Sequence, residues 1–205
     1  MSAHGRLFVV TAPSGAGKTS LVRALMAHDP TLAHSVSYTT RRPRSGEVEG
    51  KDYHFVDAVA FERMRAAGAF LEHAEVFDNR YGTARAQVDA YLAQGRNAIL
   101  EIDWQGARQV RVAMPECVSV FVLPPSRQAL EHRLEGRGTD SAEVIARRLR
   151  DAVADMGHWA EADFVVVNDD FEQALADLQA VVAGRGAALR RDRAALAPLI
   201  VSLLG

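Results

Sequence analysis

The sequence has one cysteine and no long hydrophobic run, and both absences limit what the protein can be. With Cys117 alone, the chain of 205 residues cannot form an intramolecular disulfide bond. No stretch approaches the roughly 18 apolar residues that span a bilayer, and the first residues lack the basic start and long apolar run of a secretory signal. We therefore expect a cytoplasmic protein that does not cross a membrane, and we expect its cysteine to be a small buried residue.

An excess of charge of one sign is also missing. The 24 lysines and arginines nearly balance the 26 aspartates and glutamates, and the net charge is −2. Such a chain has no overall positive field to hold a polyanion, so we expect no nucleic-acid partner. Internal repeats and low-complexity tracts are absent as well. What remains is an ordinary globular composition, 48% hydrophobic, in a chain long enough for one domain with a buried core.

Four short apolar runs are the strongest structural signal. They are rich in β-branched and aromatic residues and continuously apolar, as are strands covered on both faces of a parallel sheet. Apolar residues at helical spacing follow the first run, at Leu21 and Leu25, and the last run, at Leu175 and Leu178. This order of strands and helices predicts a doubly wound α/β core. The predicted strands are residues 7–11, 98–102, 118–123 and 164–167.

Two segments interrupt the alternation, and a tail follows it. Residues 35–94 are polar and turn-rich, and residues 127–158 are dense in arginine. We interpret both as insertions over the open end of the sheet. The tail after Arg185 is first basic and then apolar, and Pro198 should interrupt it as a continuous helix. Its apolar residues either pack on their own domain or cover a neighbouring subunit in a homo-oligomer.

A glycine-rich loop directly follows the first predicted strand and directly precedes a helical pattern. Strand, glycine-rich turn and helix start are the context of a phosphate-binding (Walker A) loop. Its glycines let backbone N–H groups turn toward phosphate oxygens, its lysine bridges the terminal phosphates of a nucleoside triphosphate, and its threonine hydroxyl ligates Mg²⁺. The first residue departs from the pattern, which has glycine there. The loop consists of Ala12, Pro13, Ser14, Gly15, Ala16, Gly17, Lys18 and Thr19.

A second group of residues suits an anionic acceptor. The turn-rich stretch from Ser37 to Glu47 carries Arg41 and Arg44, whose guanidinium groups can hold a phosphate with two N–H groups each. Tyr53 follows as a further hydrogen-bond donor. Taken singly, these residues would be ordinary turn or packing residues, and only their joint order favours a site. A second carboxylate, a phenol and a hydroxyl come later, at Glu72, Tyr81 and Thr83.

Several motifs in this order resemble the guanylate kinase family. The likeness runs from about Gly5 to Arg185, and its most specific part is the pattern Ser-x-Thr-Thr-Arg-x-Pro-Arg-x-Gly-Glu that starts at Ser37. The resemblance implies an α/β fold, a P-loop kinase core with a parallel sheet flanked by helices, plus an inserted GMP-binding subdomain and a lid. It further implies a domain over 5–185 (core 5–36, 95–125 and 159–185; GMP-binding subdomain 37–94; lid 126–158) and a C-terminal tail over 186–205.

The resemblance also implies an enzyme that transfers the γ-phosphoryl group of ATP to GMP, and to dGMP, with Mg²⁺ accompanying ATP. Guanine presents N1–H and N2–H₂ donors, which suit the Glu72 carboxylate, and the O6 acceptor, which suits the hydroxyls of Ser37 and Thr83. Adenine reverses this pattern, so AMP should be a poor acceptor. The residues implied to bind GMP are Ser37, Arg41, Arg44, Glu47, Tyr53, Glu72, Tyr81, Thr83 and Asp103.

Phosphoryl transfer depends on bringing two anions into line and stabilising the charge of the transferred group. The resemblance implies that Arg41 neutralises the surroundings of the acceptor oxygen. It also implies that Arg137 and Arg148, from the lid, close over the transferred group. Arg147 and Arg133 remain alternatives to Arg148, because arginines on a helical pattern can simply face water.

Further candidates follow strand ends, where α/β proteins bind their ligands. Asp103 ends the second predicted strand, which makes it the first choice for an acidic group near the metal or the acceptor, and Glu101 on the same run is the alternative. Asn168 follows the last predicted strand, and we place it near ATP. Lys18 completes the predicted catalytic residues.

Two other kinds of protein remain as alternatives. Guanylate-kinase-like domains of scaffolding proteins keep the fold and bind peptides without catalysis, and a damaged phosphate loop would favour that interpretation; here Lys18 and Thr19 are present. A kinase acting on a phosphorylated sugar would need the phosphate loop but none of the residues that suit guanine. Both are less favoured than a guanylate kinase.

Overall fold

The computed structural model of the chain describes residues 4–76, 78–136 and 142–205. The strands of its larger sheet are β1 (Leu7–Thr11), β2 (Ala33–His34), β7 (Ala98–Glu101), β8 (Val118–Leu123) and β9 (Phe164–Val167). Among the described residues they lie in the order β2, β7, β1, β8, β9, and the pairs β2–β7 and β8–β9 run parallel. All four predicted strands are present, and the two-residue β2 joins them. The predicted α/β fold with a parallel sheet is confirmed.

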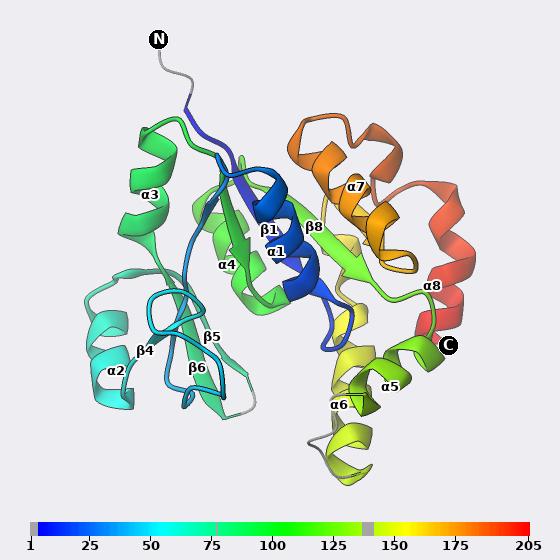
Figure 1. Cartoon of the computed structure of the whole chain (residues 1–205), viewed down its shortest axis with the longest axis horizontal. Helices are drawn as coiled ribbons and strands as arrows, with labels where there is room; N and C mark the ends of the chain where they lie inside the picture. The colour runs from blue at the N-terminus through cyan, green and yellow to red at the C-terminus, as the bar shows by residue number, and fades with distance from the viewer. Residues whose placement is uncertain (1–3, 77, 137–141) are drawn as a thin grey trace. The chain divides into compact units, whose positions relative to one another are not determined.

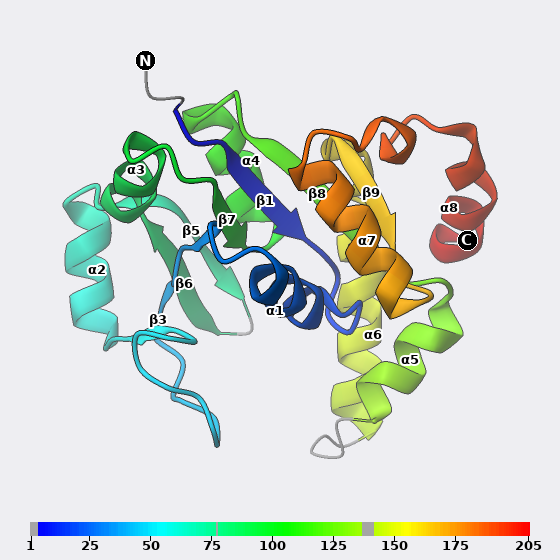
Figure 2. The ribbon, with the colours of Figure 1, turned by 45° about the horizontal axis from the view of Figure 1, so that its top comes forward.

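The chain divides into two compact units. The first comprises the residues up to Val9 together with Pro30–Cys117, and the second comprises Val10–Asp29 and Val118–Gly205. Besides strands of the larger sheet, the described part of the first unit contains further elements, which Figures 1 and 2 together label. They are β3 (Tyr38–Thr39), β4 (His54–Phe55), α2 (Ala58–Ala66), β5 (Phe70–Val76), β6 (Asn79–Ala84), α3 (Arg85–Ala93) and α4 (Trp104–Ala113).

A smaller sheet forms inside the first unit, in the order β4, β3, β6, β5. Strands β5 and β6 pair antiparallel and place Glu72 opposite Thr83, with an irregular register between Phe70 and Glu72. The sequence did not predict this sheet. Since β3 and β4 have two residues each, they are too short to show a periodic pattern.

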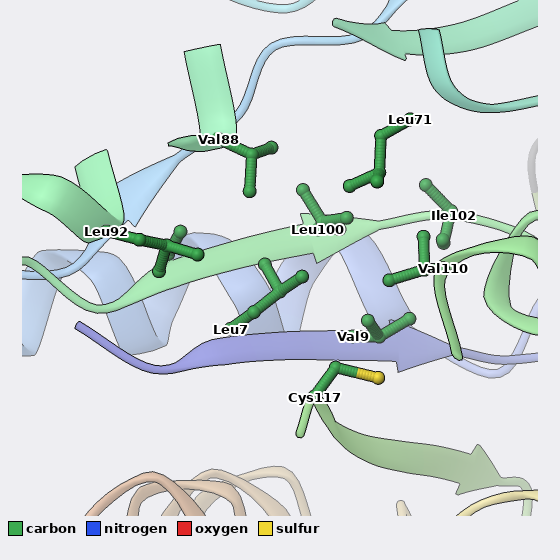
Figure 3. Packing of buried hydrophobic residues seen from close by; sticks show 10 residues of the cluster. Leu7, Val9, Leu71, Val88, Leu92, Leu100, Ile102, Val110 and Cys117 are labelled. Atoms are coloured by element: carbon green, nitrogen blue, oxygen red, sulfur yellow. The ribbon is translucent and has the colours of Figure 1, made fainter. Parts of the chain in front are cut away.

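The core of the first unit is built from apolar side chains of strands and of helices α3 and α4 (Figure 3). Cys117 is 6% exposed and lies in this cluster, as expected for a small buried residue. Leu7 and Val9 come from β1, and Leu100 comes from β7. The other labelled members are Leu71, Val88, Leu92, Ile102 and Val110.

The second unit carries the helices that precede and follow β8 and β9. Helix α1 packs against α7, as Figures 1 and 2 show from two directions. Side chains cap two of the other helices, Ser126 at α5 and Asp170 at α7, which supplies a partner for an N–H group of the first turn. The helices are α1 (Lys18–His28), α5 (Arg127–Glu135), α6 (Ala142–Met156), α7 (Phe171–Val182) and α8 (Ala197–Leu204).

The apolar tail packs on its own unit. Leu196 and Leu203 are buried in the same core cluster as Phe121 and Leu130. Helix α8 begins next to Pro198, which sits in its first turn where its missing N–H is harmless. Pro198 is therefore part of α8 and does not break it, while the tail before it forms only short 3-10 turns at Ala187–Leu189 and Ala194–Leu196. The alternative use of the tail in a homo-oligomer stays a prediction.

The helices of the described residues are short. Helix α6 has 15 residues, whereas a membrane-spanning helix needs about 20 apolar residues. Within residues 4–76, 78–136 and 142–205, no helix is long and apolar enough to cross a membrane.

Candidate active site

The candidate residues fall into two groups that belong to different units. The phosphate loop, Asn168 and Arg148 lie in the second unit, and the candidates from Ser37 to Asp103 lie in the first. Arg137 lies outside the described residues. The first group is suited to a triphosphate and the second to an acceptor.

The phosphate loop has the backbone that its glycines permit. Gly15 and Gly17 have φ angles of +88° and +93°, a region that residues with a Cβ rarely adopt. Gly17 is the N-cap of α1 and has no side chain to cap it, so the start of α1 is open to an anion rather than to its own capping group. Ala12, where the pattern has glycine, needs no such freedom, because Asp78 is the one non-glycine residue with positive φ in the described residues.

Asn168 holds the phosphate loop. Its side chain is 5% exposed, and its Nδ2 donates to the Ala16 carbonyl oxygen at 2.7 Å. A Cβ on Gly17 would lie 2.3 Å from the same Nδ2, so only glycine fits there. The backbone N–H of Asn168 donates to the carbonyl of Leu123, the last residue of β8. Asn168 therefore links the sheet to the loop.

Helix α5 supports the loop from another side. A Cβ on Gly15 would lie 2.9 Å from Leu130 and 3.1 Å from Leu134, both buried side chains of α5. Arg133 on the same helix donates from Nη2 to the Asn168 carbonyl at 2.8 Å. Its Nη1 is buried without a hydrogen-bond partner among the described residues. Arg133, an alternative in the sequence analysis, is therefore the arginine of α5 that reaches the residues around the loop.

The arginines of α6 differ in their surroundings. The Arg147 side chain is 62% exposed and lies 3.8 Å from Asp151 across one helical turn, which is an ordinary surface ion pair. Arg148 is half-buried. Of these two, Arg148 has the less solvated position, and its catalytic role stays a prediction.

In the acceptor group, Glu47 fixes Arg41. Arg41 Nη2 donates to both carboxylate oxygens of Glu47, at 2.7 and 3.0 Å, and the Arg44 backbone N–H donates to Glu47 at 2.7 Å. Burial acts to raise the pKa of Glu47, but the hydrogen bonds from Arg41 and Arg44 outweigh it and lower that pKa below its ordinary value. Glu47 is thus an ionised anchor for both arginines.

Tyr53 and Tyr81 lie next to Arg41. The Arg41 guanidinium is 5.3 Å from the ring centre of Tyr53, and the two tyrosine rings meet edge to face at 5.9 Å. Burial, the negative charge of Glu101 and the neighbouring Tyr81 raise the pKa of Tyr53 to about 12. The phenol therefore keeps its proton and can donate a hydrogen bond to an anion.

The residues predicted to read the base are brought together by the smaller sheet. Glu72 is 3% and Thr83 0% exposed, and the Thr83 hydroxyl donates to Glu72 Oε1 at 2.6 Å. The Ser37 hydroxyl lies 3.4 Å from that of Thr83. A buried carboxylate and two hydroxyls therefore sit side by side, which is the donor and acceptor set that a guanine edge requires.

Asp103 has a structural partner that the sequence analysis did not foresee. It is the N-cap of α4, and its Oδ1 accepts the Gly106 N–H at 2.8 Å while its Oδ2 accepts from the Gln105 side chain at 3.2 Å. The spacing Asp-x-x-Gly before a helical pattern carried this signal. The alternative, Glu101, is the residue whose charge acts on Tyr53.

Two residues of α4 that sequence reasoning left out touch the acceptor group. Gly106 leaves room for the Glu72 carboxylate, and Gln109 bonds to the backbone of His73. Neither has a chemical signature of its own. Only the proximity of α4 and β5 reveals them, and nothing in the local sequence predicts that proximity.

A phosphate loop between the first strand and the first helix of a parallel sheet, together with a group of arginines and tyrosines and a buried carboxylate beside two hydroxyls, indicates a P-loop kinase of the nucleotide kinase class. The family model described as guanylate kinase matches residues 4–184. The chain belongs to the guanylate kinase family.

Individual relatives agree with this assignment. A guanylate kinase of Methylococcus capsulatus is 60% identical over 98% of this chain and 99% of its own length, and one of Alkalilimnicola ehrlichii is 57% identical over 98% and 99%. Among solved structures, a guanylate kinase from Anaplasma phagocytophilum matches with a TM-score of 0.76 at 33% identity, over 91% of this chain and 88% of that one. The recognition of the family from its sequence motifs is confirmed.

Proposed function

We propose that the protein transfers the γ-phosphoryl group of ATP to GMP, or to dGMP. A phosphate oxygen of GMP forms a bond to the γ-phosphorus, the bond from that phosphorus to the β–γ bridging oxygen breaks, and the products are ADP and GDP. The observation that carries the proposal is the buried Glu72 carboxylate with the hydroxyls of Thr83 and Ser37 beside it. A family member without a base to read would have no use for this costly burial of a charge.

The guanine edge matches these groups one by one. The Glu72 carboxylate accepts from N1–H and N2–H₂ of guanine. Because the Thr83 hydroxyl already donates to Glu72, Ser37 is the hydroxyl left to donate to O6. Against adenine, each mismatched buried group would cost about 1–3 kcal/mol, so discrimination against AMP should be strong.

The phosphate of GMP would bind to Arg41, Arg44, Tyr53 and Tyr81. Arg41 is already oriented by Glu47. The Tyr53 hydroxyl stays protonated and would donate a hydrogen bond to a phosphate oxygen. Arg41 would also neutralise charge around the attacking oxygen. Glu47 serves this site by holding Arg41, and Asp103 serves it by capping α4.

ATP would bind to the phosphate loop. The loop N–H groups and Lys18 hold its phosphates, and Asn168 keeps the loop in the conformation that presents them. The loop fits a phosphate chain with its metal, since the positive φ angles of Gly15 and Gly17 suit a loop whose backbone N–H groups face an anion, and Thr19 follows Lys18 in the first turn of α1. Mg²⁺, held by the Thr19 hydroxyl, would offset the negative charge of the phosphates.

The lid would supply the remaining positive charge. Arg148 on α6 and Arg137, the latter outside the described residues, would neutralise the transferred group. We also propose the division into core, GMP-binding subdomain (37–94), lid (126–158) and tail given above, with the two insertions excluding water from the reaction. A cytoplasmic location and the absence of nucleic-acid partners complete the proposal.

ADP formation from Mg·ATP tests the proposal, with GMP, AMP, UMP and ribose bisphosphate as acceptors at matched concentration. We expect turnover with GMP and little with the others. Lys18→Ala should abolish it, whereas Lys51→Ala, which removes the same charge from an exposed turn, should not. Tight GMP binding without turnover would favour a guanylate-kinase-like domain that binds peptides without catalysis. Turnover of ribose bisphosphate would favour a kinase that acts on phosphorylated sugars.

A further inference from the structure

We propose that Gly106 is a specificity-determining positioning residue, because its missing side chain is what allows the Glu72 carboxylate to stand where it reads the base. This inference rests on the proposed function, since it concerns the same acceptor site. Gly106 does not touch GMP in this account. It acts through Glu72.

The geometry of the contact is close. Gly106 is buried, and a Cβ placed on it would lie 2.4 Å from Glu72 Oε2 and 3.0 Å from Glu72 Cδ. Carbon and oxygen atoms do not approach so closely, so any side chain at position 106 must displace the carboxylate. The other carboxylate oxygen is held by the Thr83 hydroxyl. Glu72 is therefore fixed between Thr83 on one side and the backbone of α4 on the other.

Gly106 cannot move away to make room. Its backbone N–H is bound to Asp103 Oδ1 at 2.8 Å, in the capped first turn of α4. Gln109, three residues further along the same helix, bonds to both backbone groups of His73: it accepts from the His73 N–H at 3.1 Å and donates to the His73 carbonyl at 2.7 Å. Helix α4 is thus attached to β5 at the residue next to Glu72.

Glycine is an unfavourable choice here unless the space is needed. Within a helix glycine is less favourable than alanine, and Gly106 in the first turn of α4 has no positive φ that would require glycine. The close approach of Glu72 remains as its reason. In addition, the first turn of α4 presents the positive end of its dipole to the carboxylate, which favours the ionised acceptor that the guanine N–H groups require.

The prediction concerns the choice between GMP and IMP. The base of IMP keeps the N1–H of guanine but lacks the N2 amino group, so the affinity ratio of GMP to IMP reports how well the carboxylate meets N2. In Gly106→Ala, Glu72 is displaced, and this ratio should fall about tenfold, toward the value of Glu72→Gln. Once Glu72→Gln is in place, adding Gly106→Ala should lower the ratio little further.

The experiment measures GMP and IMP binding by calorimetry, ATP-dependent turnover and thermal unfolding for each variant. Val112→Ala is the matched control: Val112 is 84% exposed on the same helix, and its change to alanine also favours helix formation without reaching β5. We expect a lower GMP to IMP ratio in Gly106→Ala, an unchanged ratio in Val112→Ala, and an unchanged KM for ATP in both. Gln109→Ala, which adds no atom, should lower the ratio in the same direction and serves if Gly106→Ala does not fold.

The outcomes separate the inference from the proposed function. A wild-type protein that binds GMP in preference to IMP but transfers no phosphoryl group would contradict the proposed function and leave the ratios to test the inference. A wild-type protein that phosphorylates GMP while Gly106→Ala, or Gln109→Ala in its place, keeps the wild-type ratio would overturn the inference alone. Equal binding of GMP and IMP by a wild type that phosphorylates GMP would overturn the inference alone, because Glu72 would then not read N2.

Discussion

Replacement of Thr83 by valine tests the hydrogen bond between Thr83 and Glu72 in the proposed acceptor site. Valine has nearly the shape of threonine, so the change removes the hydroxyl and leaves the packing of β5 against β6. The hydroxyl is buried and donates to the Glu72 carboxylate at 2.6 Å. In the variant, one oxygen of a buried carboxylate loses its donor and meets a methyl group instead.

The size of the effect follows from the charge and the burial. A hydrogen bond to a charged group contributes about 1.5–3 kcal/mol, and Glu72 has little access to water that could replace it. We expect the free energy of unfolding to fall by about 2 kcal/mol. For a chain of this length, each kcal/mol shifts Tm by about 2–4 °C, so Tm should fall by about 4–8 °C.

Urea denaturation at neutral pH and calorimetry measure both quantities, and GMP binding is measured in parallel. Thr83→Ser is the control, because serine keeps the hydroxyl and loses a methyl group. Because Thr83 is buried, losing this methyl group should lower the stability of Thr83→Ser, but its GMP affinity should stay closer to the wild-type affinity than that of Thr83→Val. A loss in Thr83→Val below about 0.5 kcal/mol, the range of neutral surface changes, would refute the reasoning.

Three further predictions concern other parts of the molecule. The pKa of Glu47 is lowered in the folded protein, so the stability that Glu47 contributes is present above its unfolded pKa and is lost as pH falls through the folded value. In Glu47→Gln, GMP binding should weaken, and the melting temperature should depend less on pH in the acid range than in the wild type. The pKa of Tyr53 is raised to about 12 from 10.0, so wild-type stability should fall as pH rises between these values, and it should fall less in Tyr53→Phe. Leu203→Ala should lower the free energy of unfolding by about 2–5 kcal/mol, because Leu203 is fully buried. Light scattering should give the same molecular mass for this variant as for the wild type, and a smaller mass would instead indicate that α8 holds an oligomer together.

The strands of the larger sheet could be predicted because each is a continuous apolar run. Residues 7–11, 118–123 and 164–167 agree with the observed strands, and the run 98–102 is one residue longer than the strand. The smaller sheet could not be predicted. Its strands β3 and β4 are held by pairing with neighbours far along the chain, and two residues carry no periodicity of their own.

The residues of the candidate site also differ in whether the sequence alone could reveal them. The phosphate loop and the pattern from Ser37 to Glu47 are local, so residue order was enough to find them. The cap formed by Asp103 is also local, and its spacing of three residues to Gly106 could have been recognised. The contact of Gly106 with Glu72 depends instead on how α4 lies on β5. Tertiary proximity of this kind leaves no trace in a single sequence, which is why the sequence suggested nothing for Gly106.

The pairing of Arg41 with Glu47 has a consequence for the timing of the proposed catalytic cycle. A free arginine side chain loses rotational freedom worth about 2 kcal/mol when it is immobilised, and Glu47 has already restricted Arg41 before a phosphate arrives. The same carboxylate offsets part of the positive charge and so limits how strongly the site holds its anion. An acceptor site of this design captures its phosphate with little delay and still lets the more highly charged product go, which a kinase that turns over repeatedly requires.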